Sequence, residues 1–135
     1  MRPPRQPYAL DTPVFSFASL ATLAARAPLG GVREVALAAY ATARMASDVG
    51  SDALPVEARK TRAASARRWL STLTIGEPVK RAFLDLIAAT ETDAATTAGA
   101  VRRVIDVTGS VLDGPSRLDL DRLVKDLDSQ TVGGT

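Results

Sequence analysis

The chain has 135 residues, a formal net charge of +2, and neither cysteine nor histidine, and its length suits a single domain. The two absences exclude disulfides, thiolate or imidazole metal ligands, and catalysis by Ser-His-Asp or Cys-His arrangements. Alanine fills 24 positions and only 4% of residues are aromatic, a composition that predicts closely packed helices rather than sheets.

The N-terminal region divides into an arm and a helix. Residues 1–12 hold three prolines and two arginines, which predicts an extended arm. A first helix is expected to begin at Thr12-Pro13, where a hydroxyl cap precedes a proline, and to run through Ala27. Its apolar run follows two arginines as in a secretory leader, but an aspartate and several prolines favour an ordinary helix. No apolar stretch reaches the roughly 20 residues that span a bilayer, so no membrane contact is expected and the predicted location is cytoplasmic.

The middle of the chain shows helical periodicity interrupted by proline and glycine. Helices are expected over 32–49 and 55–73, and a further one starts at Glu77-Pro78. Another helix, capped by Thr92 or Asp93, carries the apolar stripe as far as Leu112. The sequence leaves open whether these last two helices separate near Thr92 or run on continuously.

The C-terminal region begins with a break at residues 113–115 and ends in a small, polar tail. The last helix is predicted to take Asp119 as its N-cap, with Leu118 and Leu123 packing across the cap. Residues 129–135 are expected to form a flexible tail. The prediction is therefore an all-α fold: one domain over residues 13–128, built as a compact bundle of five or six mostly antiparallel helices.

A basic segment is the most distinctive charge feature. Residues 56–81 carry a net charge of +5, whereas residues 106–128 carry −3. The cations of the segment are Arg59, Lys60, Arg62, Arg67, Arg68, Lys80 and Arg81. They suit contact with nucleic-acid phosphates or with a partner protein. A solvated helix face, or pairing with the acidic C-terminal helix, also explains them, and the sequence leaves these alternatives open.

The last helix is a second candidate for partner contact. Its apolar stripe can dock into a groove on another chain, although completion of the domain's own core is the favoured explanation. The stripe consists of Leu120, Leu123, Val124 and Leu127. Aspartates around this helix are explained by capping and by solvation, because acids near a helix start oppose the macrodipole favourably.

Together these features predict a non-catalytic interaction module, a small subunit or adaptor of a larger assembly. Its partner is expected to be another protein or a second copy of the chain, with the basic middle and the acidic end as complementary surfaces. The alternative is a small basic subunit that binds the nucleic-acid backbone; base reading is disfavoured because the chain contains no asparagine. An enzyme acting through carboxylates ranks third, and no cofactor or metal is expected.

Overall fold

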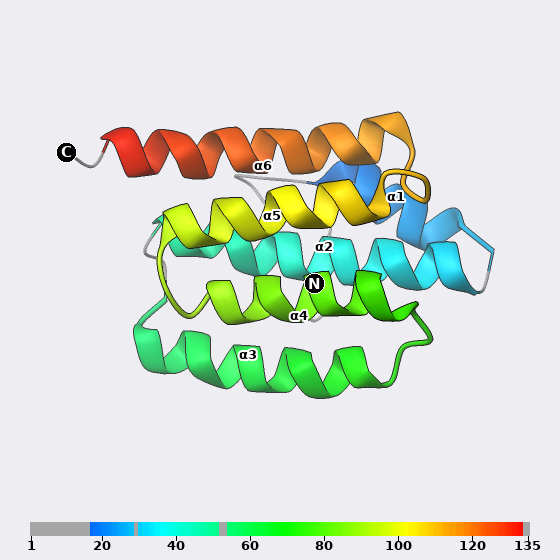
Figure 1. Ribbon diagram of the computed structural model, residues 1–135, viewed down its shortest axis with the longest axis horizontal. Helices are drawn as coiled ribbons and strands as arrows, with labels where there is room; N and C mark the ends of the chain where they lie inside the picture. The colour runs from blue at the N-terminus through cyan, green and yellow to red at the C-terminus, as the bar shows by residue number, and fades with distance from the viewer. Residues whose placement is uncertain (1–16, 29, 52–53, 134–135) are drawn as a thin grey trace, which may run out of the picture.

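The computed structural model describes residues 17–28, 30–51 and 54–133. Within these ranges the chain forms six α-helices and no strand. Consecutive helices run antiparallel to one another (Figure 1), which confirms the predicted all-α bundle. The helices are α1 (Ala18–Arg26), α2 (Gly31–Ser51), α3 (Val56–Ser71), α4 (Glu77–Ala89), α5 (Ala94–Thr108) and α6 (Gly114–Gly133).

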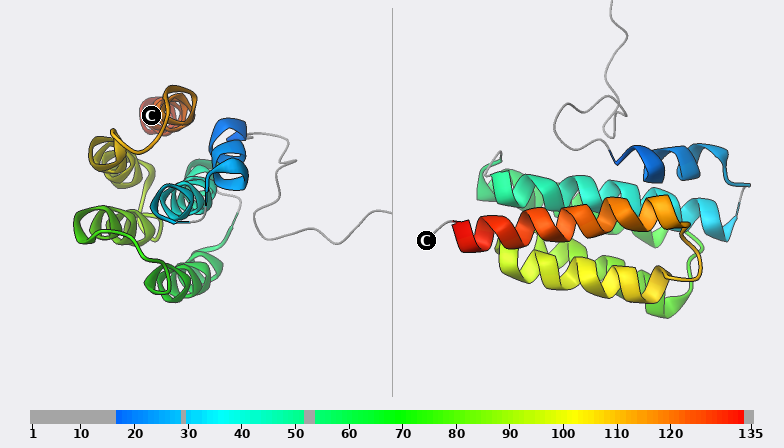
Figure 2. Two further views of the ribbon diagram at one scale, coloured as in Figure 1. Left: turned by 90° about the vertical axis from the view of Figure 1, so that its right-hand side faces the viewer. Right: turned by 90° about the horizontal axis from the view of Figure 1, so that it is seen from above.

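Helix α2 is the centre of the fold. Helices α1, α4, α5 and α6 all pack against it, and the end view in Figure 2 shows them arranged around it. The alanines of α2 explain this position, because small side chains let helix axes approach closely. Ala36, Ala38, Ala39 and Ala43 are fully buried. Larger buried residues of the surrounding helices, among them Phe83, fill the space between those helices and α2.

Helix α3 lies at the edge of the bundle and packs mainly on α4 (Figure 2). Its buried residues are only Ala63, Ala66 and Leu70. Trp69 is partly buried and packs against the core. Because α3 buries so little apolar surface, hydrophobic packing holds it less firmly than the other long helices, and polar contacts become important for its placement.

Two predicted helix boundaries are settled by local capping. Helices α4 and α5 are separate, because the Asp93 carboxylate accepts a hydrogen bond from the Thr96 backbone N–H at 2.8 Å and so caps α5. Helix α5 ends at Thr108 rather than continuing to Leu112. The next residue is a glycine, and the N–H groups of Val111 and Leu112 both donate to the Thr108 carbonyl in a closing turn.

The prediction that Asp119 caps the last helix is wrong. Helix α6 begins at Gly114, and the Asp113 carboxylate accepts a hydrogen bond from the Ser116 N–H at 2.9 Å. The proline that suggested a break instead occupies the first turn, where its missing N–H costs nothing.

At the C-terminal end of the predicted domain, the last helix is longer than expected. Helix α6 continues to Gly133, so most of the expected tail is helical; Gln130 supports it by donating to Asp126 one turn earlier at 2.9 Å. At the other end α1 begins at Ala18 and ends at Arg26. The expected start at Thr12-Pro13 and the arm over 1–12 lie outside the described residues.

Candidate functional site

The structure divides the seven cations of the basic segment into two groups. Arg59, Arg62 and Arg67 join α3 to neighbouring parts of the fold. The other four form no ion pair with any residue that the structure describes. The first group explains how α3 is held, and the second is the candidate site.

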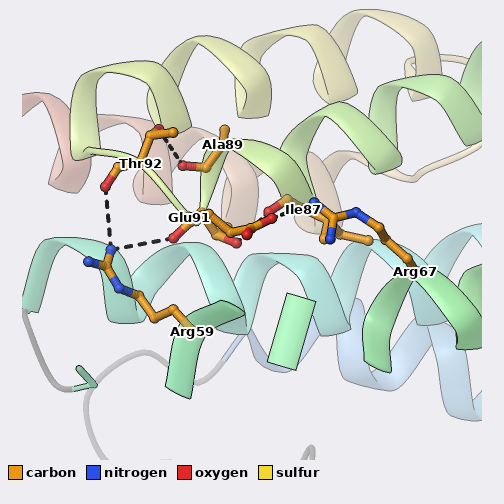
Figure 3. Close-up of polar contacts among 7 residues, drawn as sticks. Arg59, Arg67, Ile87, Ala89, Glu91 and Thr92 are labelled. Carbon is orange, nitrogen blue, oxygen red and sulfur yellow. Dashed lines mark hydrogen bonds and ion pairs between the residues drawn. The ribbon is translucent and has the colours of Figure 1, made fainter. Parts of the chain in front are cut away.

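Arg59 attaches the beginning of α3 to the end of α4. Its guanidinium donates to the backbone carbonyl oxygens of Thr90 and Thr92, at 3.4 Å each (Figure 3). Carbonyls at a helix C-terminus lack intrahelical donors and lie at the negative end of the macrodipole, so a cation is favourable there. From the other side of the same turn, Glu91 pairs with Arg67 (Figure 3).

Arg62 attaches α3 to the central helix. Its guanidinium lies 2.9 Å from the Asp48 carboxylate of α2. Both side chains are about one-third exposed, at 30% and 34%, so solvent weakens the pair and its contribution is modest, roughly 0–1 kcal/mol. The contacts of Arg59, Arg62 and Arg67 compensate for the small apolar surface that α3 buries. Because these three cations are engaged within the fold, four of the seven remain available to a partner.

We define the cationic surface as Lys60, Arg68, Lys80 and Arg81. Lys60, Arg68 and Arg81 are exposed and Lys80 is half-buried. Arg68 lies in the last turn of α3, while Lys80 and Arg81 lie in the first two turns of α4. A short turn joins these antiparallel helices (Figure 1), so the three residues lie at the same end of the hairpin. Lys60 lies two turns back along α3 from Arg68.

Acidic residues on the same hairpin limit its charge. Glu57 and Glu77 occupy the first turns of α3 and α4, where the positive end of each macrodipole offsets part of their charge. Asp85 is exposed on α4, one turn from Arg81. The hairpin is therefore cationic but moderately so, which suits a reversible contact.

The acidic end of the chain is largely occupied within the fold. Asp128 pairs with Arg102 of α5, Asp126 accepts from Gln130, and Asp119 is buried. The acidic residues 106–128 were expected to form a surface complementary to a partner. Because several of their carboxylates are engaged within the fold, few remain available for such a contact.

The apolar stripe of α6 lies inside the domain. Leu120, Leu123, Val124 and Leu127 are all buried and belong to the hydrophobic core. Their burial agrees with the favoured sequence-based explanation, in which the helix completes the core of its own domain. Among the large apolar side chains that the structure describes, those more than a third exposed are Val32, Leu37, Val56 and Leu118.

No family model, curated protein or solved structure matches the chain. Function must therefore be argued from the residues themselves. In the described residues, no cluster of acidic side chains is arranged to hold a metal ion, and no described helix is long and apolar enough to cross a membrane.

Asp119 has a structural role that sequence reasoning missed. Helix α1 starts after Phe17, a buried residue with φ of 45° that supplies no side-chain cap. The Asp119 carboxylate of α6 accepts a hydrogen bond from the Leu20 N–H at 3.0 Å and thereby satisfies a backbone donor of the first turn of α1. Capping patterns are local, and this contact joins residues 99 positions apart, so no sequence signal could have shown it.

An open groove lies beside α1. It has a volume of ≈ 420 Å³ and is lined mainly by small and apolar residues, with Arg26 and Asp113 also in its lining. Neither charged residue forms an ion pair with a described residue. The groove contains a single cation, Arg26, so the cationic surface, with four, is the stronger candidate for contact with an anionic partner.

Proposed function

We propose that the chain is a non-catalytic interaction module, a small subunit or adaptor of a larger assembly, and that the cationic surface is its contact site. The observation that carries this proposal is the division of the basic segment. Arg59, Arg62 and Arg67 contact neighbouring helices and turns, whereas the other four cations have no carboxylate partner among the described residues. An anionic partner would supply the missing charges and would gain electrostatic steering during association.

The same charge distribution favours a foreign partner over a second copy of this chain. Self-association through opposite charges needs an available acidic face, but Asp119, Asp126 and Asp128 are engaged within the domain. The exposed side of α6 instead carries Arg117, Arg122 and Lys125 beside Asp121. A second copy therefore offers no strong anionic surface to the hairpin.

Site-specific photo-crosslinking tests the proposal. Ala64 is exposed on α3, one turn from both Lys60 and Arg68, so a benzophenone amino acid at this position would face the partner. The matched control places the same group at exposed Ser129 on α6. In cells that naturally contain the protein, we expect a discrete adduct from position 64 that disappears in the Lys60→Glu/Arg68→Glu background. No adduct at position 64, or the same adduct from position 129, would contradict the proposal.

A further inference from the structure

We propose that the cationic surface binds the phosphate backbone of a nucleic acid without reading its sequence. This inference rests on the proposed function and names the chemistry of the partner. Four cations without carboxylate partners lie on α3 and α4, whose residues 56–89 carry seven Lys/Arg against three Asp/Glu. Residues 94–133, which form α5 and α6, carry five Lys/Arg against six Asp/Glu, so the α3–α4 hairpin is the surface that favours phosphates.

The spacing of the cations fits a regular array of charges. Lys60 and Arg68 are eight residues apart on α3, which is about 12 Å along the helix axis. Arg68 lies at the same end of the hairpin as Lys80 and Arg81. Each strand of a duplex presents a phosphate about every 3.4 Å along the axis, so a span of this length meets several phosphates in any register. A protein surface offers carboxylates only at particular positions, which makes the phosphate backbone the better match.

The helices that carry the cations offer little aromatic surface to bases. The aromatic residues of α3 and α4 are Trp69 and Phe83. Trp69 is partly buried against the core and Phe83 is fully buried, so little aromatic surface is left on which a base could stack. Contacts made only to phosphates position a protein but carry no sequence information.

The acids of the hairpin set an expectation for affinity. Glu57, Glu77 and Asp85 reduce the net charge that phosphates experience. We therefore expect binding at the weak end of the non-specific range, with a Kd of about 10⁻⁴ M at physiological salt and tighter binding in dilute buffer.

The test is a salt series with a fluorescently labelled DNA duplex of mixed sequence, with binding to the full chain followed by anisotropy. Four phosphate contacts predict a slope of log K against log salt of about −3.6, because each contributes about −0.9. Replacement of Arg68 or Arg81 by glutamine should make the slope shallower by about 0.9 each. Replacement of all four cations by glutamine should remove binding.

The matched control replaces four exposed cations elsewhere. Arg103→Gln, Arg117→Gln, Arg122→Gln and Lys125→Gln together give the same net charge as the four-site variant, and circular dichroism verifies that both remain folded. We expect the control to bind DNA with the slope of the unaltered chain. Equal loss of binding in the two variants would overturn the inference, since it would show attraction by net charge alone. A marked preference for one DNA sequence would also overturn it.

Poly-L-glutamate separates this inference from the proposed function. If poly-L-glutamate binds the chain through the cationic surface while DNA does not, the partner is an acidic protein; the phosphate inference is then refuted and the interaction module stands. DNA binding that the four-site variant loses and the control keeps supports both. If neither polymer binds and position 64 yields no photo-adduct, both are refuted.

Discussion

Replacement of Asp119 by alanine should lower the stability of the domain, because the first turn of α1 loses a hydrogen-bond acceptor. The carboxylate accepts a hydrogen bond from the Leu20 N–H at 3.0 Å, and both residues are buried. A hydrogen bond to a charged group contributes about 1.5–3 kcal/mol, and an orphaned buried donor costs about 1–3 kcal/mol; the two figures describe the same loss and are not added. Removal of a buried carboxylate also relieves its desolvation cost, which offsets part of the loss. The net expectation is a decrease of about 1–3 kcal/mol in the free energy of unfolding.

Urea unfolding followed by circular dichroism measures this change. The control is Asp121→Ala, on the same helix but exposed, which should alter stability by less than about 0.5 kcal/mol. Asp119→Asn keeps an oxygen acceptor and should fall between the two. Hydrogen exchange adds a local measurement, because the Leu20 amide should exchange faster in Asp119→Ala. Equal midpoints for Asp119→Ala and Asp121→Ala, with unchanged Leu20 exchange, would refute the capping role.

Three further predictions concern the core, an ion pair and pH. Phe83→Ala should lower the free energy of unfolding by about 3–5 kcal/mol, measured in urea, because a large and fully buried ring is removed; a loss below about 1 kcal/mol would contradict its placement. A double-mutant cycle on Arg62 and Asp48 should give a coupling of about 1 kcal/mol or less, since the pair is partly exposed, and a coupling of several kcal/mol would show a more buried contact. The backbone hydrogen bond from Thr96, followed by the side-chain contact with the same residue, holds the pKa of Asp93 below its ordinary value. The resulting stabilisation is fully present above the unfolded value of about 3.9 and is lost as pH falls through the lower folded pKa; an NMR titration that gives Asp93 an ordinary pKa would oppose this.

The features that the sequence predicted correctly are those with local physical causes. Helical periodicity and proline positions located most of α2, α3 and α4. Asp93 was one of two proposed caps, and its hydrogen bond to Thr96 spans only three residues. Local rules also produced the error at Asp119, because an aspartate followed by an apolar stripe looks like a helix start whether or not the helix began five residues earlier.

The features that the sequence could not predict depend on which helices become neighbours. Helical spacing places Arg62 beside the apolar stripe of its helix, but nothing in the sequence indicates that its partner is Asp48 on another helix. Likewise, no pattern indicates that Asp128 pairs with Arg102. The cationic surface consists of those cations of the basic segment that form no ion pair or hydrogen bond with another part of the described fold. Since such contacts depend on which helices are neighbours, the surface could be identified only from the fold.

The contact between Asp119 and Leu20 also constrains how the protein is made. During synthesis the first helix emerges 99 residues before the carboxylate that caps it, and a helix of nine residues is too short to be stable alone in water. Helix α1 packs against both α2 and α6, so its full set of contacts forms only after the start of α6 has left the ribosome. A chain that stops before residue 119 would lack the acceptor for the Leu20 N–H, which makes α1 sensitive to truncation within α6.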